Sequence, residues 1–231
     1  MLKIAPALPG QRRQLAGFAI LSLVAAAAAQ ALDLWGVGSF FEPYFAGFSS
    51  ASVFGATAVI GVISLRALQA CGWFDTRQRG DLMGVGVAVA LATLFAISVV
   101  TVDRFVGIKV INVPMPWSLL FYPTVALVVE VFFHTLPLAL MFASLRSIAR
   151  SDSDRIGWVC IIVVSLLEPT YQLRFELAGR SLSWLDIYVW THVWAINLVQ
   201  LYLFRRFGFA SMYGMRLVYY LDWHIVWEYL R

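Results

Sequence analysis

The sequence predicts an all-α protein, a polytopic transmembrane helical bundle of about seven spans. The chain has 231 residues, of which 61% are hydrophobic and only 13% are charged, and its mean hydropathy is +0.79. A soluble domain of this length needs far more polar surface, so we expect the solvent of this chain to be a bilayer. Its apolar runs lack the period-two alternation of membrane strands, which disfavours a barrel.

Each predicted span is an apolar run close to 20 residues long, the length that crosses a hydrocarbon core about 30 Å thick. The fifth run is short, and Pro169 closes it. The first run is longer than the apolar region of a signal peptide, so we expect it to stay in the protein as a span. No repeat or linker is visible, and residues 1–231 form one integral membrane domain. The predicted spans are Leu15–Leu34, Ser50–Ala70, Asp81–Val102, Trp117–Leu145, Ile156–Thr170, Ser183–Phe204 and Ala210–Leu230.

Basic residues predict the orientation of these spans. On one side of the membrane the sequence places 11 of its 17 Lys and Arg: Lys3, Arg12, Arg13, Arg66, Arg77, Arg79, Arg146, Arg150, Arg155, Arg205 and Arg206. The other side receives Arg104, Lys109, Arg174, Arg180 and Arg231. The positive-inside rule then gives a cytoplasmic N-terminus and an outer C-terminus. We expect a multi-pass protein of a bacterial-type inner (plasma) membrane. The net charge of +4 reflects this topology, and we expect membrane lipids and no nucleic acid as partners.

Ionisable side chains occur inside the predicted spans, where they are costly and suggest function. All three histidines, His134, His192 and His224, fall within spans, and Glu130 lies near the middle of the fourth. One intramembrane histidine often only joins two helices by a hydrogen bond. Three histidines together with a mid-span glutamate favour a shared polar site.

Helical spacing groups these residues in pairs. Glu130 and His134, Tyr188 and His192, and His224 and Glu228 are each four residues apart, so each pair lies on one helix face. With a rise of about 1.5 Å per residue, His192 and His224 lie in the outer half of the membrane, within about two turns of Glu130. We therefore expect Glu130, His192 and His224 to converge within a few ångströms.

Two other intramembrane charges have simpler interpretations. Glu168 adjoins Pro169 near a helix end, where we expect it to touch interfacial water. Arg216 is expected to extend its side chain toward the cytoplasmic surface. The tryptophans of the last two spans are typical of an aromatic belt at the membrane interface.

Three motifs occur in order along the last four spans: "VEVFFH" from Val129 to His134, "YVWTH" from Tyr188 to His192, and "HIVWE" from His224 to Glu228. This set resembles the CAAX prenyl protease and bacteriocin-processing family of intramembrane proteases, which includes the Rce-type prenyl endoproteases. That family carries Glu-Glu-x-x-x-Arg, Phe-x-x-x-His and His-x-x-x-Asn or Asp. The resemblance covers residues 117–231.

The chain departs from the family pattern at three positions. Val129 stands where the family has its water-activating glutamate, His134 stands for the arginine, and Glu228 replaces the final Asn or Asp. The resemblance implies an intramembrane endopeptidase that cleaves a peptide or transmembrane-helix substrate. Glu130 would be the general base, and His192 and His224 would orient water and stabilise the oxyanion. His134, Tyr188 and Glu228 would support them.

Burial among apolar side chains makes a carboxylate a stronger base, which suits Glu130 to this role. The alternative is a divalent metal such as zinc held by His134, His192 and His224 with Glu130, although no His-Glu-x-x-His signature is present. Any other cofactor is unknown. Two non-hydrolytic alternatives stay open: a membrane scaffold or partner-binding protein of the same fold, and a haem or quinone protein. Transport is less favoured, because no internal repeat is visible.

Overall fold

The computed structural model describes residues 9–45, 47–74, 81–108, 112–148, 153–176 and 181–231, and all regular structure in these ranges is helical. The first part of the chain forms α1 (Pro9–Leu34), η1 (Gly38–Phe41), α2 (Glu42–Phe45), α3 (Ser50–Ala70) and α4 (Asp81–Val106). The second part forms α5 (Ser118–Val129), η2 (Glu130–Thr135), α6 (Leu136–Ile148), α7 (Ser153–Ser165), α8 (Leu167–Glu176), α9 (Trp184–Phe207), α10 (Phe209–Tyr220), η3 (Leu221–Trp227) and α11 (Glu228–Leu230). The fold is thus the all-α bundle that the composition predicts.

Six helical segments of the described chain are long and apolar enough to cross a membrane: Arg12–Leu34, Ser50–Ala70, Met83–Val106, Ser118–Ile148, Asp154–Arg174 and Trp184–Phe207. The fifth runs past Pro169, so the predicted end at Thr170 is wrong. The predicted seventh span is helical from α10 through η3 to α11, although it is not among these six. Together they form an all-α bundle of about seven spans.

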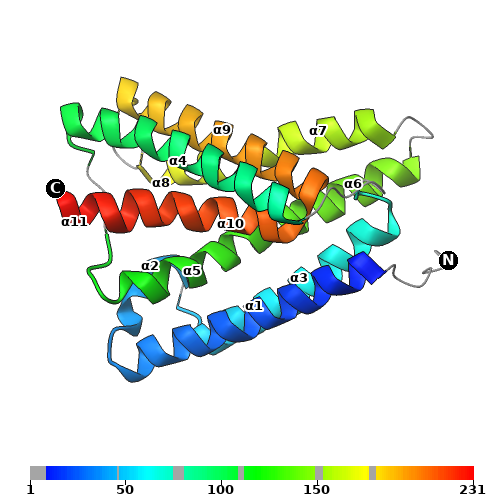
Figure 1. The fold of residues 1–231 in the computed structure, drawn as a ribbon, viewed down its shortest axis with the longest axis horizontal. Helices are drawn as coiled ribbons and strands as arrows, with labels where there is room; N and C mark the ends of the chain where they lie inside the picture. Colours follow the sequence, from blue (N-terminus) through cyan, green and yellow to red (C-terminus); the bar gives the residue numbers. More distant parts are fainter. Residues whose placement is uncertain (1–8, 46, 75–80, 109–111, 149–152, 177–180) are drawn as a thin grey trace.

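The long helices run along a common axis, and α1 begins at the end of the bundle opposite to the end where α11 lies (Figure 1). At the α1 end of the bundle, arginines lie near the start of α1 (Arg12, Arg13) and of α7 (Arg155), and near the ends of α3 (Arg66), α6 (Arg146) and α9 (Arg205, Arg206). The opposite end has Arg104, Arg174 and Arg231. The remaining basic residues of the topology argument, Lys3, Arg77, Arg79, Lys109, Arg150 and Arg180, lie outside the described residues. The described arginines are therefore as unevenly divided as the positive-inside argument requires.

The last helical rod, α10 through α11, occupies the middle of the bundle, where α10 packs on α4, α9 and α5 (Figure 1). A tight turn at Gly208 joins it to α9. The φ of Gly208 is 95°, a left-handed conformation that favours glycine, and a Cβ there would meet the Gln14 side chain. The start of α9 is fixed by a capping box between Ser183 and Asp186. The Gly208 turn and the capping box together place α9 and α10 antiparallel to each other, with the polar residues of α10 inside the protein.

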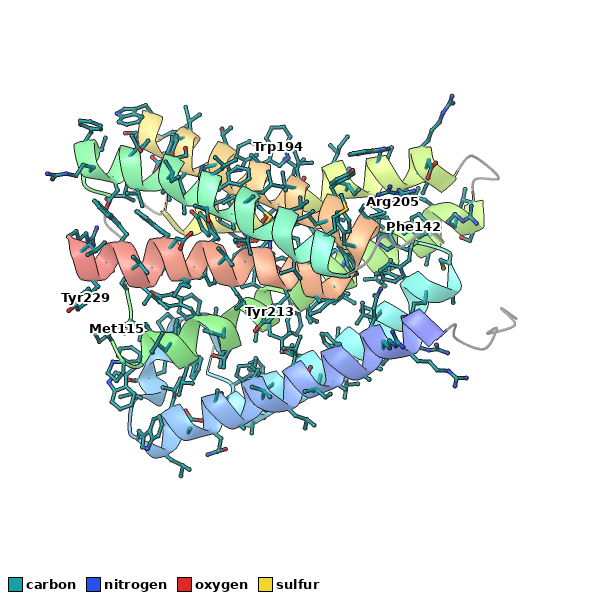
Figure 2. All side chains as sticks on the ribbon, viewed as in Figure 1. Met115, Phe142, Trp194, Arg205, Tyr213 and Tyr229 are labelled. Atoms are coloured by element: carbon teal, nitrogen blue, oxygen red, sulfur yellow. The ribbon has the colours of Figure 1, made fainter. Side chains whose placement is uncertain are left out.

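Apolar side chains divide between the interior and the outer surface. Inside, Trp73 packs edge to face on Phe142, and Tyr213 lies between α10 and α5 (Figure 2), where its hydroxyl donates to the Pro123 carbonyl at 2.9 Å. Large apolar side chains cover the outside of the spans, among them Leu23, Val59, Ile63, Leu94, Ile97 and Leu140. Such a surface suits a hydrocarbon environment, since water would not tolerate apolar patches of this extent.

Candidate functional site

A buried arginine on α10 is the centre of the polar interior. The Arg216 side chain, only 4% exposed, holds Glu168 of α8 with both terminal nitrogens, at 2.9 Å (Nη1 to Oε1) and 2.8 Å (Nη2 to Oε2). Its Nε donates to Glu130 Oε1 on η2. One guanidinium thus joins two carboxylates from different spans. The fork geometry of arginine suits such a bidentate contact.

Glu130, 0% exposed, has hydrogen-bond donors on both of its carboxylate oxygens. Oε1 accepts from Arg216 and from Gln200 Nε2 at 2.7 Å, and Oε2 lies 2.7 Å from His134 Nδ1. An ionised carboxylate only accepts, so Nδ1 of His134 carries the hydrogen. The predicted pairing of Glu130 and His134 across one helical turn is confirmed.

Among the described residues, the second ring nitrogen of His134 has no hydrogen-bond partner, although His134 is fully buried. The nearest carboxylate oxygen of Glu168, Oε2, lies 3.7 Å from this Nε2. A distance of 3.7 Å is too long for a hydrogen bond but still within the range of an ion pair. His134 therefore bridges two glutamates, one firmly through Nδ1 and one loosely through Nε2.

Two amides of α9 complete the cluster. Gln200 and Asn197 accept from Arg216 Nη2 with their side-chain oxygens, at 3.1 and 3.3 Å. Both amide nitrogens donate elsewhere, that of Gln200 to Glu130 and that of Asn197 to the Ser165 carbonyl at 3.3 Å. The cluster Glu130, His134, Glu168, Asn197, Gln200 and Arg216, here called the central cluster, therefore draws on η2, α8, α9 and α10.

The helix that carries Glu130 and His134 is locally widened. Residues Glu130–Thr135 form a π-helical segment, closed by a bond from the Leu136 N–H to the Val131 carbonyl. Pro137 has no N–H for the carbonyl four residues earlier, and the Thr135 hydroxyl donates to the Glu130 carbonyl at 2.9 Å. Wide turns of this type are frequent at functional sites.

The helix that carries Glu168 is interrupted. α7 ends at Ser165 and α8 begins at Leu167, with Pro169 in the first turn of α8. Proline cannot donate to the Ser165 carbonyl, so that carbonyl is free to accept from Asn197. Glu168 in the first turn also faces the positive end of the α8 dipole, which favours its ionised form. The interruption thus frees the Ser165 carbonyl beside the central cluster, and Asn197 supplies the donor for it.

His192 belongs to a different set of contacts. Its Nε2 lies 3.2 Å from the Tyr219 hydroxyl, and its ring stacks on Tyr188 with centroids 5.5 Å apart. Tyr188 in turn shares a hydrogen bond with Ser98 at 3.2 Å. The predicted pair Tyr188 and His192 is therefore in contact. Within the described residues, no hydrogen bond or ion pair links His192 to Glu130.

His224 lies in a polar group nearer the end of the chain. Its Nδ1 donates to Asn112 Oδ1 at 2.8 Å, and its ring stacks on Tyr122 at 4.7 Å. Asn112 also donates to Glu228 Oε2 at 2.7 Å, so His224 and Glu228 are joined through Asn112. Direct bonds from His224 to Glu130 or His192 are absent from the described part of the chain. The hydrogen bonding therefore groups Glu130 with His134 and assigns the other two histidines to separate partners.

Three of the sequence interpretations need correction or narrowing. Arg216 does not extend to the surface, and Glu168 does not touch interfacial water, since both are nearly inaccessible and bind each other. Among the described residues, no three His, Cys, Asp or Glu side chains are grouped as metal ligands, so His134, His192 and His224 do not form the alternative zinc site. The signal that could have found the pair of Arg216 and Glu168 was the presence of one basic and one acidic residue within two different apolar spans.

Comparison of the chain with models of known protein families, with curated proteins and with solved structures finds no match.

Proposed function

We propose that this protein moves protons through the membrane by way of the central cluster, with His134 as the group that carries the proton. One observation carries this proposal: His134 is fully buried between two carboxylates. Its Nδ1 lies 2.7 Å from Glu130, and its Nε2, which has no hydrogen-bond partner in the described part of the chain, lies 3.7 Å from Glu168. Ionisable groups in this setting are typical of intramembrane proton relays.

The charges of the cluster support a proton on His134. Glu130, Glu168 and Arg216 sum to one negative charge, and an imidazolium at His134 brings the total to zero. Burying an unbalanced charge costs several kcal/mol even after relaxation. At 3.7 Å, with an effective dielectric constant of about 20, the attraction between the imidazolium and the Glu168 carboxylate is about 4.5 kcal/mol. A neutral ring would instead aim the Nε2 lone pair at a carboxylate oxygen.

The same geometry lets the proton leave. The Nε2–H bond of His134 breaks, its electron pair stays on nitrogen, and the proton passes to Glu168 Oε2 over a gap that a small side-chain movement closes. Glu130 and Arg216 hold their positions through the other hydrogen bonds of the cluster. Interrupted and widened helices at the site resemble those of transporters, in which broken spans surround ion sites. Here the irregular stretches are η2 and the α7–α8 junction.

The membrane is proposed to be an inner (plasma) membrane of bacterial type. The uneven division of arginines between the two ends supports a cytoplasmic α1 end and an outer α11 end. Lipids of that membrane are the proposed surroundings of the apolar outer surface.

Proteoliposomes with an internal pH dye test the proposal. A potassium diffusion potential is imposed with valinomycin, and the rate of internal pH change is compared with that of protein-free vesicles. We expect wild-type protein to speed the change, and His134→Gln and Glu168→Gln to return it to the protein-free rate. His192→Gln should retain the wild-type rate, because His192 contacts Tyr219 and Tyr188 and not the cluster. Wild-type vesicles no faster than protein-free ones would refute proton movement.

A second candidate function is the intramembrane endopeptidase that the motifs imply. The observation in its favour is the 2.7 Å contact between Glu130 and His134 inside the π-helical segment of the first motif, since a carboxylate and an imidazole together suit general-base catalysis. For Glu130 to activate water it must first give up a donor, because Arg216, Gln200 and His134 occupy both oxygens.

Turnover of fluorogenic transmembrane peptides distinguishes the two candidates. A general base contributes about 10²–10⁴-fold, so Glu130→Gln in an active peptidase would lose that factor, and His192→Gln would also lose activity. Proton movement that requires His134 but not His192, without peptide cleavage, supports the first candidate. Absence of both activities leaves the scaffold role, in which the cluster only fixes the helix arrangement.

A further inference from the structure

We infer that a cavity between α7 and α9, at the α1 end of the bundle, binds the phosphate group of an anionic phospholipid. The cavity measures about 250 Å³ and is lined by Asp154 and Trp158 of α7 and by Tyr202, Arg205 and Arg206 of α9. None of these five residues belongs to the central cluster, so the inference goes beyond the proposed function and does not depend on proton movement. Arg205 is labelled near α7 in Figure 2.

Contacts with three other residues hold the Arg205 guanidinium at the wall of this cavity. Its Nη2 donates to Asp154 Oδ1, and its Cζ lies 5.2 Å from the centroid of the Trp73 ring, a cation–π contact. Gly157 leaves room for the guanidinium, because a Cβ at this position would lie 1.3 Å from Arg205 Nη1. The fold therefore fixes a positive charge beside the cavity.

The Arg205 guanidinium retains a donor for a further ligand. Among the described residues, its buried Nη1 has no hydrogen-bond partner. The Asp154 side chain that accepts from Nη2 is 80% exposed, so another anion can compete with it for the guanidinium. Two arginines and one aspartate give the lining a net charge of +1. A phosphate oxygen in the cavity would supply the acceptor that Nη1 lacks after a small rotation of the guanidinium, and the planar fork of arginine suits phosphate.

The edge of the cavity favours a lipid over a free anion. Trp158 and Tyr202 stack there with ring centroids 5.9 Å apart, and both side chains are about half exposed. These two residue types are typical of the membrane interface. One turn deeper on the same face of α7, Ile162 is also exposed. A phospholipid can place its phosphate in the cavity and an acyl chain along Ile162, whereas free phosphate gains only the first contact.

The position of the cavity along the bundle suits an anionic lipid. The proposed orientation makes the α1 end cytoplasmic, and the cytoplasmic leaflet carries anionic lipids. Basic pockets between membrane helices on that side are known to bind anionic headgroups. Arg205 and Arg206 also lie in the last turn of α9, where the helix dipole stabilises cations. The two arginines are thus placed where an anionic headgroup of that leaflet can reach them.

Displacement of a fluorescent lipid tests the inference. The protein in neutral-detergent micelles is mixed with phosphatidylglycerol that carries an NBD label on one acyl chain, and energy transfer from tryptophan measures binding. The unlabelled competitors are phosphatidylglycerol, phosphatidylcholine with the same chains, and inorganic phosphate. We expect phosphatidylglycerol to compete about tenfold better than phosphatidylcholine, whose choline cation is repelled by the arginines, and inorganic phosphate not to compete. Equal competition by phosphatidylcholine, or competition by inorganic phosphate as strong as that of phosphatidylglycerol, would overturn the lipid assignment.

Variants of the lining test the position of the site. Arg205→Gln and Arg206→Gln should each weaken phosphatidylglycerol binding about tenfold, the loss expected for a charge-assisted hydrogen bond. The matched control Arg146→Gln removes an exposed charge from α6 at the same end of the bundle and should change binding less than about twofold.

Asp154→Asn provides a variant that should bind more tightly than the wild type. It removes the carboxylate that competes for Arg205, so we expect phosphatidylglycerol binding to strengthen severalfold, a gain that misfolding cannot produce. Three results would overturn the site and leave the proposed function intact: unchanged binding in both arginine variants, an equal loss in Arg146→Gln, or no gain in Asp154→Asn.

Discussion

Removing the Arg216 charge tests the charge balance of the central cluster with a single side chain. Arg216→Met keeps most of the side-chain volume but leaves Glu130 and Glu168 buried without their common counter-ion. Removal of one partner from a buried ion pair costs about 3–5 kcal/mol, and Arg216 serves two carboxylates, so we expect a loss at the upper end of that range. Reversible unfolding in bicelles, followed by steric trapping, measures this free energy.

A second substitution separates charge balance from loss of packing. In Arg216→Met with Glu168→Gln, the remaining groups are Glu130 and the imidazolium that the proposed function places on His134, which are hydrogen-bonded to each other. We expect the double variant to be more stable than Arg216→Met by about 2 kcal/mol or more, a coupling within the range of residues in direct contact. The charge-balance argument is refuted if the unfolding free energy of Arg216→Met lies within about 1 kcal/mol of that of the wild type. It is also refuted if the double variant is no more stable than Arg216→Met.

Three further predictions concern separate parts of the fold. Asn197→Val leaves the Ser165 carbonyl without its amide donor and should lower the unfolding free energy by about 1–3 kcal/mol, whereas no change would show that the helix interruption needs no partner. Gly61→Ala brings a Cβ into the Phe18 ring and should cost about 1–3 kcal/mol in the same assay. Gly55→Ala on the same helix meets open space and should be neutral or slightly stabilising. In a chain without Cys71 and Cys160, a membrane-impermeant maleimide added to intact cells should label a cysteine at Lys109 and not one at Arg77 or Arg150, and the reverse pattern would overturn the orientation.

The bundle itself could be predicted from the sequence because hydropathy acts on whole segments. Every predicted span overlaps a helix, and the errors lie at the ends, where Pro169 was expected to close the fifth span. Proline interrupts that helix at Leu166 instead, and the helix resumes as α8 because Asn197 satisfies the freed carbonyl. Such a partner lies on another span, so single-sequence reasoning could not supply it.

The candidate site was predictable within a helix and not between helices. Spacing by four correctly paired Glu130 with His134 and Tyr188 with His192, because helix geometry alone decides such contacts. The expected convergence of Glu130, His192 and His224 depended on the rotation of three spans about their axes, which depth arguments do not determine. Arg216 was assigned to the surface because a long side chain can reach water. The interior carboxylates attract it more strongly than the interface does, and only the packing of α10 shows that they are within reach.

The placement of Arg216 has a consequence for how the chain enters the membrane during synthesis. An arginine at the centre of an isolated span opposes insertion by about 2.5–3.5 kcal/mol, and the segment from α10 to α11 is the one predicted span that does not qualify as apolar among the described residues. Both of its acidic partners, Glu130 and Glu168, are made earlier, on spans that precede it in the chain. The segment from α10 to α11 therefore enters a membrane that already contains the spans with Glu130 and Glu168. Its stable insertion depends on the earlier assembly of these two spans.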